Sequence, residues 1–182
     1  DLLLVDAGCE YEMYAADITR TFPVSGKFSD EQLAIYKVVL DAMNAAIDMV
    51  KPGNHIMQPQ EMSEKVITEG LVKLGLLDGD PEELHKSGAY KEFYMHKIGH
   101  WFGLDVHDAG DYVEGEEYMK FKPGMITTIE PGIYISSSMD VDDKWKGIGI
   151  RIEDDILVTK DGNENLTKKV PSDPEEIESL MS

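Results

Sequence analysis

The chain has 182 residues, 42% of them hydrophobic, which is enough for one globular domain with a sizeable core. No apolar run approaches the roughly 20 residues of a membrane-spanning helix, so we expect no membrane partner. The formal net charge is −19, from 36 acidic and 17 basic residues, which argues against nucleic acid as a partner. Cys9 is the single cysteine, so no intrachain disulfide can form. We expect it to be a small buried side chain in a cytoplasmic protein.

Two carboxylates lie on the strands expected at the start of the chain. The opening apolar run ends at Asp6, and the run 14–22 contains Asp17. Folding the chain back around Tyr11 and Glu12 places Asp6 opposite Asp17. Opposed side chains on one face of an antiparallel pair have Cβ atoms roughly 5 Å apart, which suits two acids that bind metals about 3.5–4 Å apart.

The middle of the chain is expected to be helical scaffold. Ser29 and Gln32 have the spacing of a capping box, and apolar residues then recur at helical spacing until Pro52-Gly53 ends the helix. A second amphipathic helix is expected over 61–74. Residues 75–94, rich in Gly, Asp and charge, are expected to form a loop with a short helical turn.

Histidines follow this loop. His96 and His100 have the i, i+4 spacing of a helical zinc pair, but no Glu follows the first, and Gly99 lies between them. The sequence therefore disfavours a zinc-binding helix. His55 and His85 occur in polar, turn-prone surroundings, and we expect both to be surface residues without partners.

The C-terminal half repeats the paired-strand arrangement. Residues 125–135 and 148–158 are expected to be strands, and a symmetric fold-back places Glu130 opposite Glu153. Isoleucines alternate before Glu153, so this acid lies where a strand is otherwise buried, and a buried charge requires a partner such as a divalent cation. A register slip of one residue would turn either carboxylate to the other face.

Five blocks in this order resemble the proline-specific M24B metallopeptidases, most closely the aminopeptidase P branch. The blocks are DAGCEY at 6–11, YAADITRTFP at 14–23, GHWFGLDVHD at 99–108, TIEPGIY at 128–134 and GIRIEDD at 149–155. The resemblance implies an α+β pita-bread fold, a curved antiparallel sheet backed by helices, here lacking its N-terminal part. Residues 1–170 would form the catalytic domain, and 171–182 an acidic tail or short helix.

The resemblance also implies a two-metal site, with Asp17 and Glu153 as bridging ligands. The implied ligands are Asp6, Asp17, His100, Glu130 and Glu153. One imidazole among four carboxylates is a hard, oxygen-rich site that suits Mn²⁺, although Zn²⁺ and Co²⁺ remain open. Two such ions can share one water, lower its pKa and polarise the scissile carbonyl.

Five residues are candidates for the remaining catalytic and substrate-binding roles. Glu130 matches the carboxylate that takes and returns protons, and His107 is placed to stabilise charge on the former carbonyl oxygen. His96 matches a histidine that lines the pocket for the proline ring, and Tyr134 matches an active-site tyrosine. Arg151 precedes Glu153 by two residues and can orient its carboxylate or a substrate group.

The activity that the resemblance implies is release of the N-terminal residue from peptides with proline in second position. An Xaa-Pro dipeptidase and a catalytically silent peptide-binding module remain alternatives, whereas a methionine aminopeptidase fits the blocks at 99–108 and 149–155 less well. The family implies homodimers or homotetramers of the full-length protein.

Overall fold

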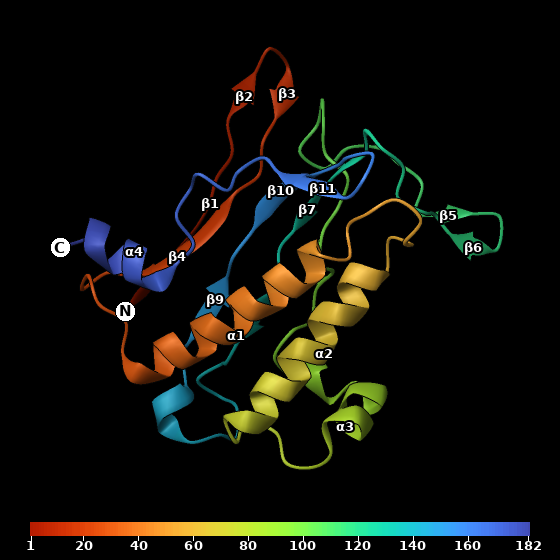
Figure 1. Cartoon of the computed structure of the whole chain (residues 1–182). Helices are drawn as coiled ribbons and strands as arrows, with labels where there is room; N and C mark the ends of the chain where they lie inside the picture. Colours follow the sequence, from red (N-terminus) through yellow and green to blue (C-terminus); the bar gives the residue numbers. More distant parts are fainter.

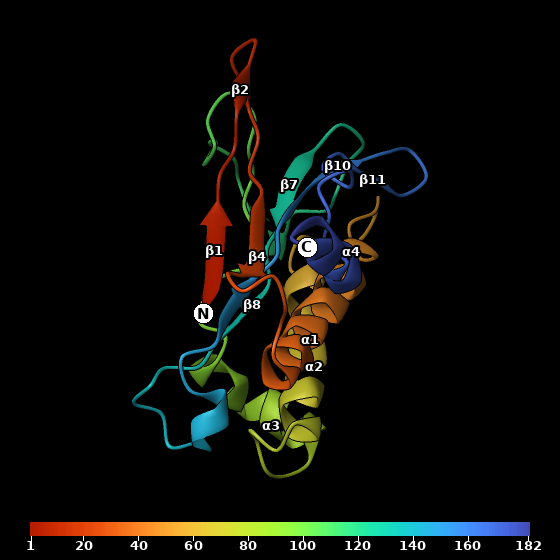
Figure 2. The same ribbon diagram turned by 90° about the vertical axis from the view of Figure 1, so that its left-hand side faces the viewer.

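The computed structural model describes residues 1–182 and has a mixed α+β architecture. Short antiparallel strands lie on one side of the molecule, and the two long helices pack together on the other (Figures 1 and 2). The hydrophobic core lies between these layers and contains helix residues such as Tyr36 and Met43 together with strand residues such as Ile133 and Ile150.

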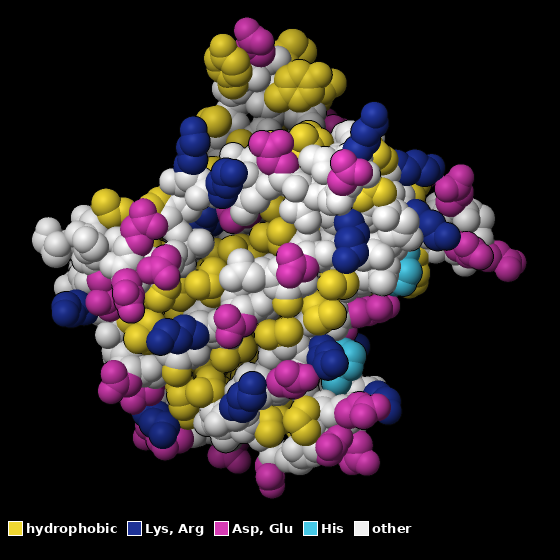
Figure 3. Space-filling model, viewed as in Figure 1, with side chains coloured by type: hydrophobic (Ala, Val, Ile, Leu, Met, Phe, Trp, Pro, Cys, Tyr) yellow, Lys and Arg dark blue, Asp and Glu magenta, His cyan; other side chains and the backbone are white.

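Strands β1 (Leu2–Asp6) and β4 (Thr19–Pro23) form an antiparallel pair, which the hairpin of β2 (Glu10–Tyr11) and β3 (Tyr14–Ala15) extends. The hairpin turns at Glu12 and Met13, with φ angles of 50° and 75°. Positive φ at both turn residues matches the twist of the flanking strands, although neither residue is the usual Gly or Asn. The tip projects from the molecule and exposes hydrophobic side chains (Figures 1 and 3).

The predicted turn at Tyr11 and Glu12 is therefore wrong by one residue. Moving the turn by one residue shifts the strand register by two, so Asp6 lies opposite Thr19 rather than opposite Asp17. A shift of two keeps every side chain on its expected face, because side chains alternate with a period of two. Cys9, predicted to be buried, is exposed near the base of this projecting hairpin.

The second strand pair has the predicted register. Strand β7 (Ile126–Ile129) pairs with β10 (Asp154–Val158), and β8 (Gly132–Tyr134) pairs with β9 (Gly149–Arg151), all antiparallel. Ile129 lies opposite Asp154, and Gly132 lies opposite Arg151, so one register runs through both pairs. Glu130 and Glu153 fall opposite each other in the gap between them.

The strands do not form the single curved sheet that the resemblance implies. They form a three-stranded sheet of β7, β10 and β11 (Asn163–Asn165) and four two-stranded sheets. The last of these pairs β5 (Val113–Glu114) with β6 (Glu117–Tyr118) in a small exposed hairpin. On its other edge β1 has no partner strand.

The helices begin where capping residues allow. Helix α1 (Asp30–Ile47) starts at the predicted capping box of Ser29 and Gln32. Helix α2 (Gln58–Lys73) starts three residues earlier than predicted, because Pro59 fits the first turn of a helix. The predicted helical turn within 75–94 is α3 (Pro81–Ser87), followed by the 3₁₀ turn η1 (Ala89–Glu92).

The histidines predicted to be surface residues without partners do have partners. The ring of His85 stacks on Tyr90, and its Nε2 lies 3.6 Å from a Glu64 carboxylate oxygen. His55 stacks on Tyr118 and is partly buried. Both pairings join segments that are remote in sequence or separated by a turn, which local polarity does not reveal.

Two further short helical elements complete the fold. The 3₁₀ turn η2 (Asp143–Trp145) lies between β8 and β9, and the short helix α4 (Pro174–Leu180) begins at an Asp173 cap. None of the helices combines the length and apolarity that crossing a membrane requires.

Candidate active site

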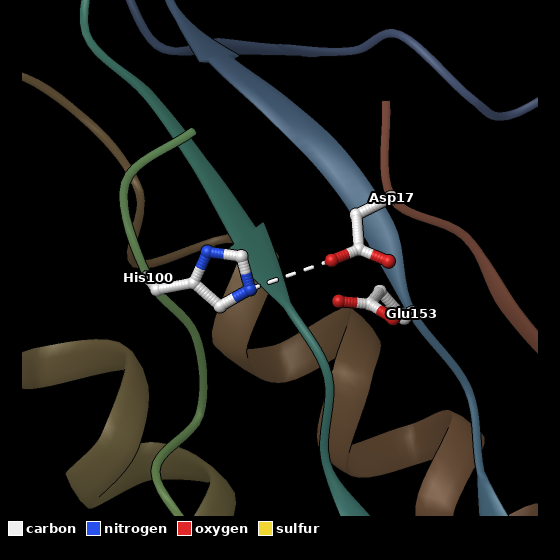
Figure 4. A group of neighbouring side chains, drawn as sticks. All are labelled: Asp17, His100 and Glu153. Carbon is white, nitrogen blue, oxygen red and sulfur yellow. Dashed lines mark ion pairs between the residues drawn. The ribbon is translucent and has the colours of Figure 1, made fainter. Parts of the chain in front are cut away.

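Three predicted ligands converge from segments far apart in the sequence. Asp17, His100 and Glu153 each offer one ligand atom, and these atoms lie within 4.8 Å of one another (Figure 4). The His100 Nε2 lies 3.5 Å from Asp17 Oδ2. Asp17 and Glu153 are buried, with exposed fractions of 8% and 1%. A charge so deeply buried requires a partner of opposite charge or strong hydrogen bonds.

The tautomer of His100 follows from its hydrogen bonds. Its Nδ1 lies 3.1 Å from the Trp101 carbonyl oxygen, so this nitrogen carries the proton and donates it. The Nε2 atom faces two carboxylates, Asp17 and Glu130, with oxygens 3.5 Å away in each case. An imidazole nitrogen and two carboxylates can all be ligands of one cation.

Glu130 and Glu153 lie opposite each other on neighbouring antiparallel segments, and each accepts a hydrogen bond from a threonine hydroxyl group. Thr128 donates from Oγ1 to Glu130 Oε1 at 3.3 Å, and Thr19 donates from Oγ1 to Glu153 Oε2 at 2.6 Å. These hydroxyl groups fix the two carboxylates while leaving an oxygen of each available. Both threonines are fully buried, and the sequence prediction missed them.

Asp6 lies at the edge of this group and is half exposed. Its Oδ2 accepts a hydrogen bond of 2.5 Å from Arg151 Nη2. Asp6 is not part of the cluster of Asp17, His100 and Glu153. Its charge still acts on the site, because burial and then the Asp6 carboxylate raise the pKa of Asp17. Asp6 and Asp17 are thus neighbours, although Asp17 lies between β3 and β4 and is not paired opposite Asp6.

Arg151 connects the ligands to the predicted substrate residues. Besides Asp6, it donates from Nε to Thr19 Oγ1 at 3.3 Å and from Nη1 to Tyr134 Oη at 3.2 Å. The Tyr134 hydroxyl in turn lies 2.8 Å from His96 Nε2. Because the Tyr134 oxygen accepts from Arg151, its proton is directed to His96, whose Nδ1 donates to the Lys97 carbonyl at 2.8 Å.

Burial lowers the pKa of His96, and the nearby Arg151 charge adds to this effect. His96 is therefore a neutral side chain that lines the site. His96 is not on a helix and forms no helical zinc pair with His100. The prediction against a zinc-binding helix is therefore confirmed.

His107 lies beside the ligand histidine. Its ring centroid is 4.4 Å from that of His100, at an interplanar angle of 82°. The loop between them is tightened by Asp108, whose Oδ2 accepts from the Leu104 backbone N–H at 3.2 Å. His107 is exposed, so its ring can reach a ligand at the mouth of the site.

The segment carrying the histidines is held by two further contacts that the sequence did not reveal. The Ile98 N–H donates to Gln60 Oε1 at 2.5 Å, and Gln60 is a buried residue of α2. The His100 N–H donates to Thr128 Oγ1 at 3.0 Å. Gly99 permits this approach, since a Cβ there would lie 2.0 Å from the Thr128 carbonyl oxygen.

The electrostatics of the acids favour a bound cation. Burial and then the Glu130 charge raise the pKa of Glu153 to about 8. Burial, together with repulsion from Asp17, raises the pKa of Glu130 to about 7. Arg151 is the one permanent cation that forms an ion pair with the carboxylate of a ligand candidate, and that carboxylate is Asp6. The donor set of carboxylates and one imidazole nitrogen therefore fits a divalent metal ion.

An open cavity of about 310 Å³ lies over this group, a size at the lower end for small-ligand pockets. Its lining includes His96, Lys97, His100, His107, Glu130 and Arg151. The structure thus brings the predicted histidines, Glu130 and Arg151 to one cavity, and Tyr134 contacts it through His96 and Arg151.

The chain is similar in sequence to known aminopeptidases. The chain is 52% identical over 182 residues to an Xaa-Pro aminopeptidase of Haemophilus influenzae, and 50% identical over 181 residues to that of Escherichia coli. It covers 42% and 41% of those proteins, respectively, so it spans less than half of their length.

The solved structure of Pseudomonas aeruginosa aminopeptidase PepP matches the whole chain with a TM-score of 0.98 and 56% identity, and the chain covers 41% of it. Residues 1–160 match the model of metallopeptidase family M24. The five sequence blocks and the acid-histidine cluster all lie within that span. The chain therefore belongs to metallopeptidase family M24.

Proposed function

We propose that the protein containing this chain is a metal-dependent Xaa-Pro aminopeptidase, which hydrolyses the bond between an N-terminal residue and a following proline. The observation that carries the proposal is the position of His100 Nε2, which faces the carboxylates of Asp17 and Glu130 beside the buried Glu153. The similarity to Xaa-Pro aminopeptidases over the whole chain supports it.

The proposed centre holds two divalent ions, most often Mn²⁺, with Asp6, Asp17, His100, Glu130 and Glu153 as ligands. When bound, such ions supply an activated water and polarise the scissile carbonyl. Asp6 would need to exchange part of its contact with Arg151 for a metal, which its half-exposed position permits. Thr19 and Thr128 would keep Glu153 and Glu130 in position.

The remaining side chains would bind and orient the peptide. His96 and Tyr134 hydrogen-bond to each other and would form the wall against which the proline ring packs. His107 would donate a hydrogen bond to the oxygen on which charge develops, and Glu130 would move the proton from water to the leaving nitrogen. Arg151 would hold the side chains of Tyr134 and Asp6 in position through its hydrogen bonds to both.

The proposal includes the whole-protein architecture. Residues 1–170 would be the catalytic part and 171–182 an acidic segment that contains the short helix α4. The small antiparallel sheets would belong to the curved sheet of a pita-bread fold. The match to the aminopeptidase PepP structure supports this assignment.

The test is manganese-dependent hydrolysis by the natural protein of an Xaa-Pro-Yaa tripeptide, an Xaa-Pro dipeptide and an Xaa-Ala-Yaa control. We expect cleavage of the Xaa-Pro bond in the tripeptide and its loss in Glu130→Gln. Glu114→Gln, on the exposed β5 strand, is the matched control and should retain activity. Cleavage of the dipeptide alone would identify a dipeptidase, and metal binding without cleavage of any peptide would identify a binding module.

A further inference from the structure

Lys97 is a cation of the cavity that the proposed mechanism does not use. It lies between His96 and Ile98 on the histidine segment and lines the same cavity as His100 and Glu130. Its Nζ is 5.4 Å from the centroid of the Tyr112 ring, a cation–π distance. The ammonium is thus held at the cavity wall.

Tyr112 is a fixed platform for this lysine. Its ring stacks on Trp101 with centroids 5.6 Å apart, and its hydroxyl accepts from the Trp101 N–H at 3.2 Å. Tyr112 is partly buried and also lines the cavity. A cation over an aromatic face keeps its N–H donors available on the side away from the ring.

The two permanent cations of the cavity differ in their partners. Arg151 uses all three guanidinium nitrogens for Asp6, Thr19 and Tyr134. Lys97 has no carboxylate oxygen within 4.0 Å and so forms no ion pair within the chain. In a protein of net charge −19, Lys97 is the cavity cation whose charge is available to a ligand.

The reach of Lys97 matches a position on a bound peptide. Lys97 precedes His100 by three positions, so their Cα atoms lie within about 11 Å. In an extended peptide, the carboxyl group of the third residue lies about 7 Å beyond the carbonyl of the first. A peptide whose first carbonyl lies at His100 and whose chain runs along the cavity toward Lys97 has its third residue within reach of the lysine.

We propose that Lys97 binds a carboxylate on the third residue of the substrate, so that the site favours peptides with an anionic group two positions beyond the cleaved bond. The proposal rests on the function proposed above. The carboxylate can be the free C-terminus of a tripeptide or the side chain of Asp or Glu. In either case the positive charge of Lys97 offsets the repulsion that the ligand carboxylates exert on an anionic substrate.

The test measures binding, so that it does not depend on turnover. Isothermal titration calorimetry with the Mn²⁺-loaded natural protein would compare the product-like dipeptide prolyl-alanine with its C-terminal amide. We expect the acid to bind about three- to tenfold more tightly, a preference that decreases at high salt because the pair is exposed. Prolyl-glutamic acid α-amide, in which only the side-chain carboxylate remains, separates the two sources.

Variants assign the preference to one side chain. Lys97→Met keeps the packing over Tyr112 but removes the charge, and should bring the acid-to-amide affinity ratio to about one. Lys97→Arg should restore the ratio. Lys37→Met, on the exposed surface of α1, is the matched control and should retain the wild-type ratio.

An acid preference that persists in Lys97→Met, or that is absent from the wild-type protein, would overturn the inference. A preference that depends on Lys97 in a protein that cleaves no Xaa-Pro peptide would instead refute the proposed function and leave the carboxylate site standing. A gain with the side-chain carboxylate alone would assign the site to acidic residues rather than to a C-terminus.

Discussion

Arg20 and Asp154 form a buried ion pair of 2.7 Å on the opposite strand face from the hydrogen-bonded pair of Thr19 and Glu153. Arg20 also donates from Nη1 to the Glu153 carbonyl at 2.6 Å and from Nε to the Pro171 carbonyl at 2.9 Å. Because side chains alternate along a strand, this buried pair behind the site fixes the backbone from which Glu153 projects into it.

Arg20→Met should destabilise the protein strongly, because Asp154 would remain as a buried charge without its cation. The expected loss in the free energy of unfolding is about 3–5 kcal/mol, measured by chemical denaturation. Lys86→Met is the control, since Lys86 and Glu82 form an exposed pair of 2.6 Å whose loss should change the stability little. Similar losses in the two variants would contradict the structural role of Arg20.

Thr19→Val should weaken metal binding while preserving the fold. The change keeps the side-chain shape but removes the hydroxyl that donates to Glu153 Oε2. We expect about a tenfold loss of Mn²⁺ affinity, measured by calorimetry or by electron paramagnetic resonance of free Mn²⁺. Thr68→Val removes an equally buried hydroxyl on α2, which donates to the Glu64 carbonyl, and should leave Mn²⁺ affinity intact.

Gly99→Ala should displace the segment that carries His100. The added Cβ would lie 2.0 Å from the Thr128 carbonyl oxygen, so the backbone must move. We expect a loss of about 1–3 kcal/mol in stability together with weaker Mn²⁺ binding. At Gly162 an added Cβ meets nothing within 4 Å, so Gly162→Ala should change neither quantity appreciably. Equal effects at both glycines would argue against a close-packed segment.

The metal-free protein should lose stability as the pH rises from 5 to 8. Burial raises the pKa of Glu130 from 4.5 to about 7 and that of Glu153 from 4.5 to about 8. In this window the folded state binds more protons than the unfolded state, so unfolding becomes easier as pH increases. The slope is roughly 1.4 kcal/mol per pH unit for each carboxyl group.

Thermal unfolding of chelator-treated protein at pH 5, 6, 7 and 8 measures this slope. Saturating Mn²⁺ should reverse it, because the metal binds the ionised carboxylates. Glu130→Gln should flatten the slope of the metal-free protein. A metal-free protein that is more stable at pH 8 than at pH 5 would show that these acids are solvated rather than desolvated.

The sequence predicted those parts of the fold that depend on local or symmetric patterns. The capping box at Ser29 fixed the start of α1, and the symmetric fold-back predicted Glu130 opposite Glu153. The first hairpin was misplaced by one residue because its turn uses Glu12 and Met13 at positive φ, where the sequence offers no glycine.

Partners that are remote in the sequence could not be predicted in the same way. Nothing near Gln60 indicates that its side chain accepts a hydrogen bond from Ile98, because that contact depends on how α2 packs against the histidine segment. The hydroxyl groups of Thr19 and Thr128 resemble ordinary strand threonines until the strands are assembled. The coarse positions of the ligand candidates follow from pattern, whereas the groups that orient them follow from tertiary packing.

The candidate ligands are spread from Asp6 to Glu153, so the site exists only after the first and last strands have met. Contacts between such distant segments are slow to form because the loop between them must close first. A metal ion can therefore contribute little to the folding transition state. Its binding energy would mainly slow unfolding, making the metal a determinant of how long the native state persists rather than how quickly it is reached.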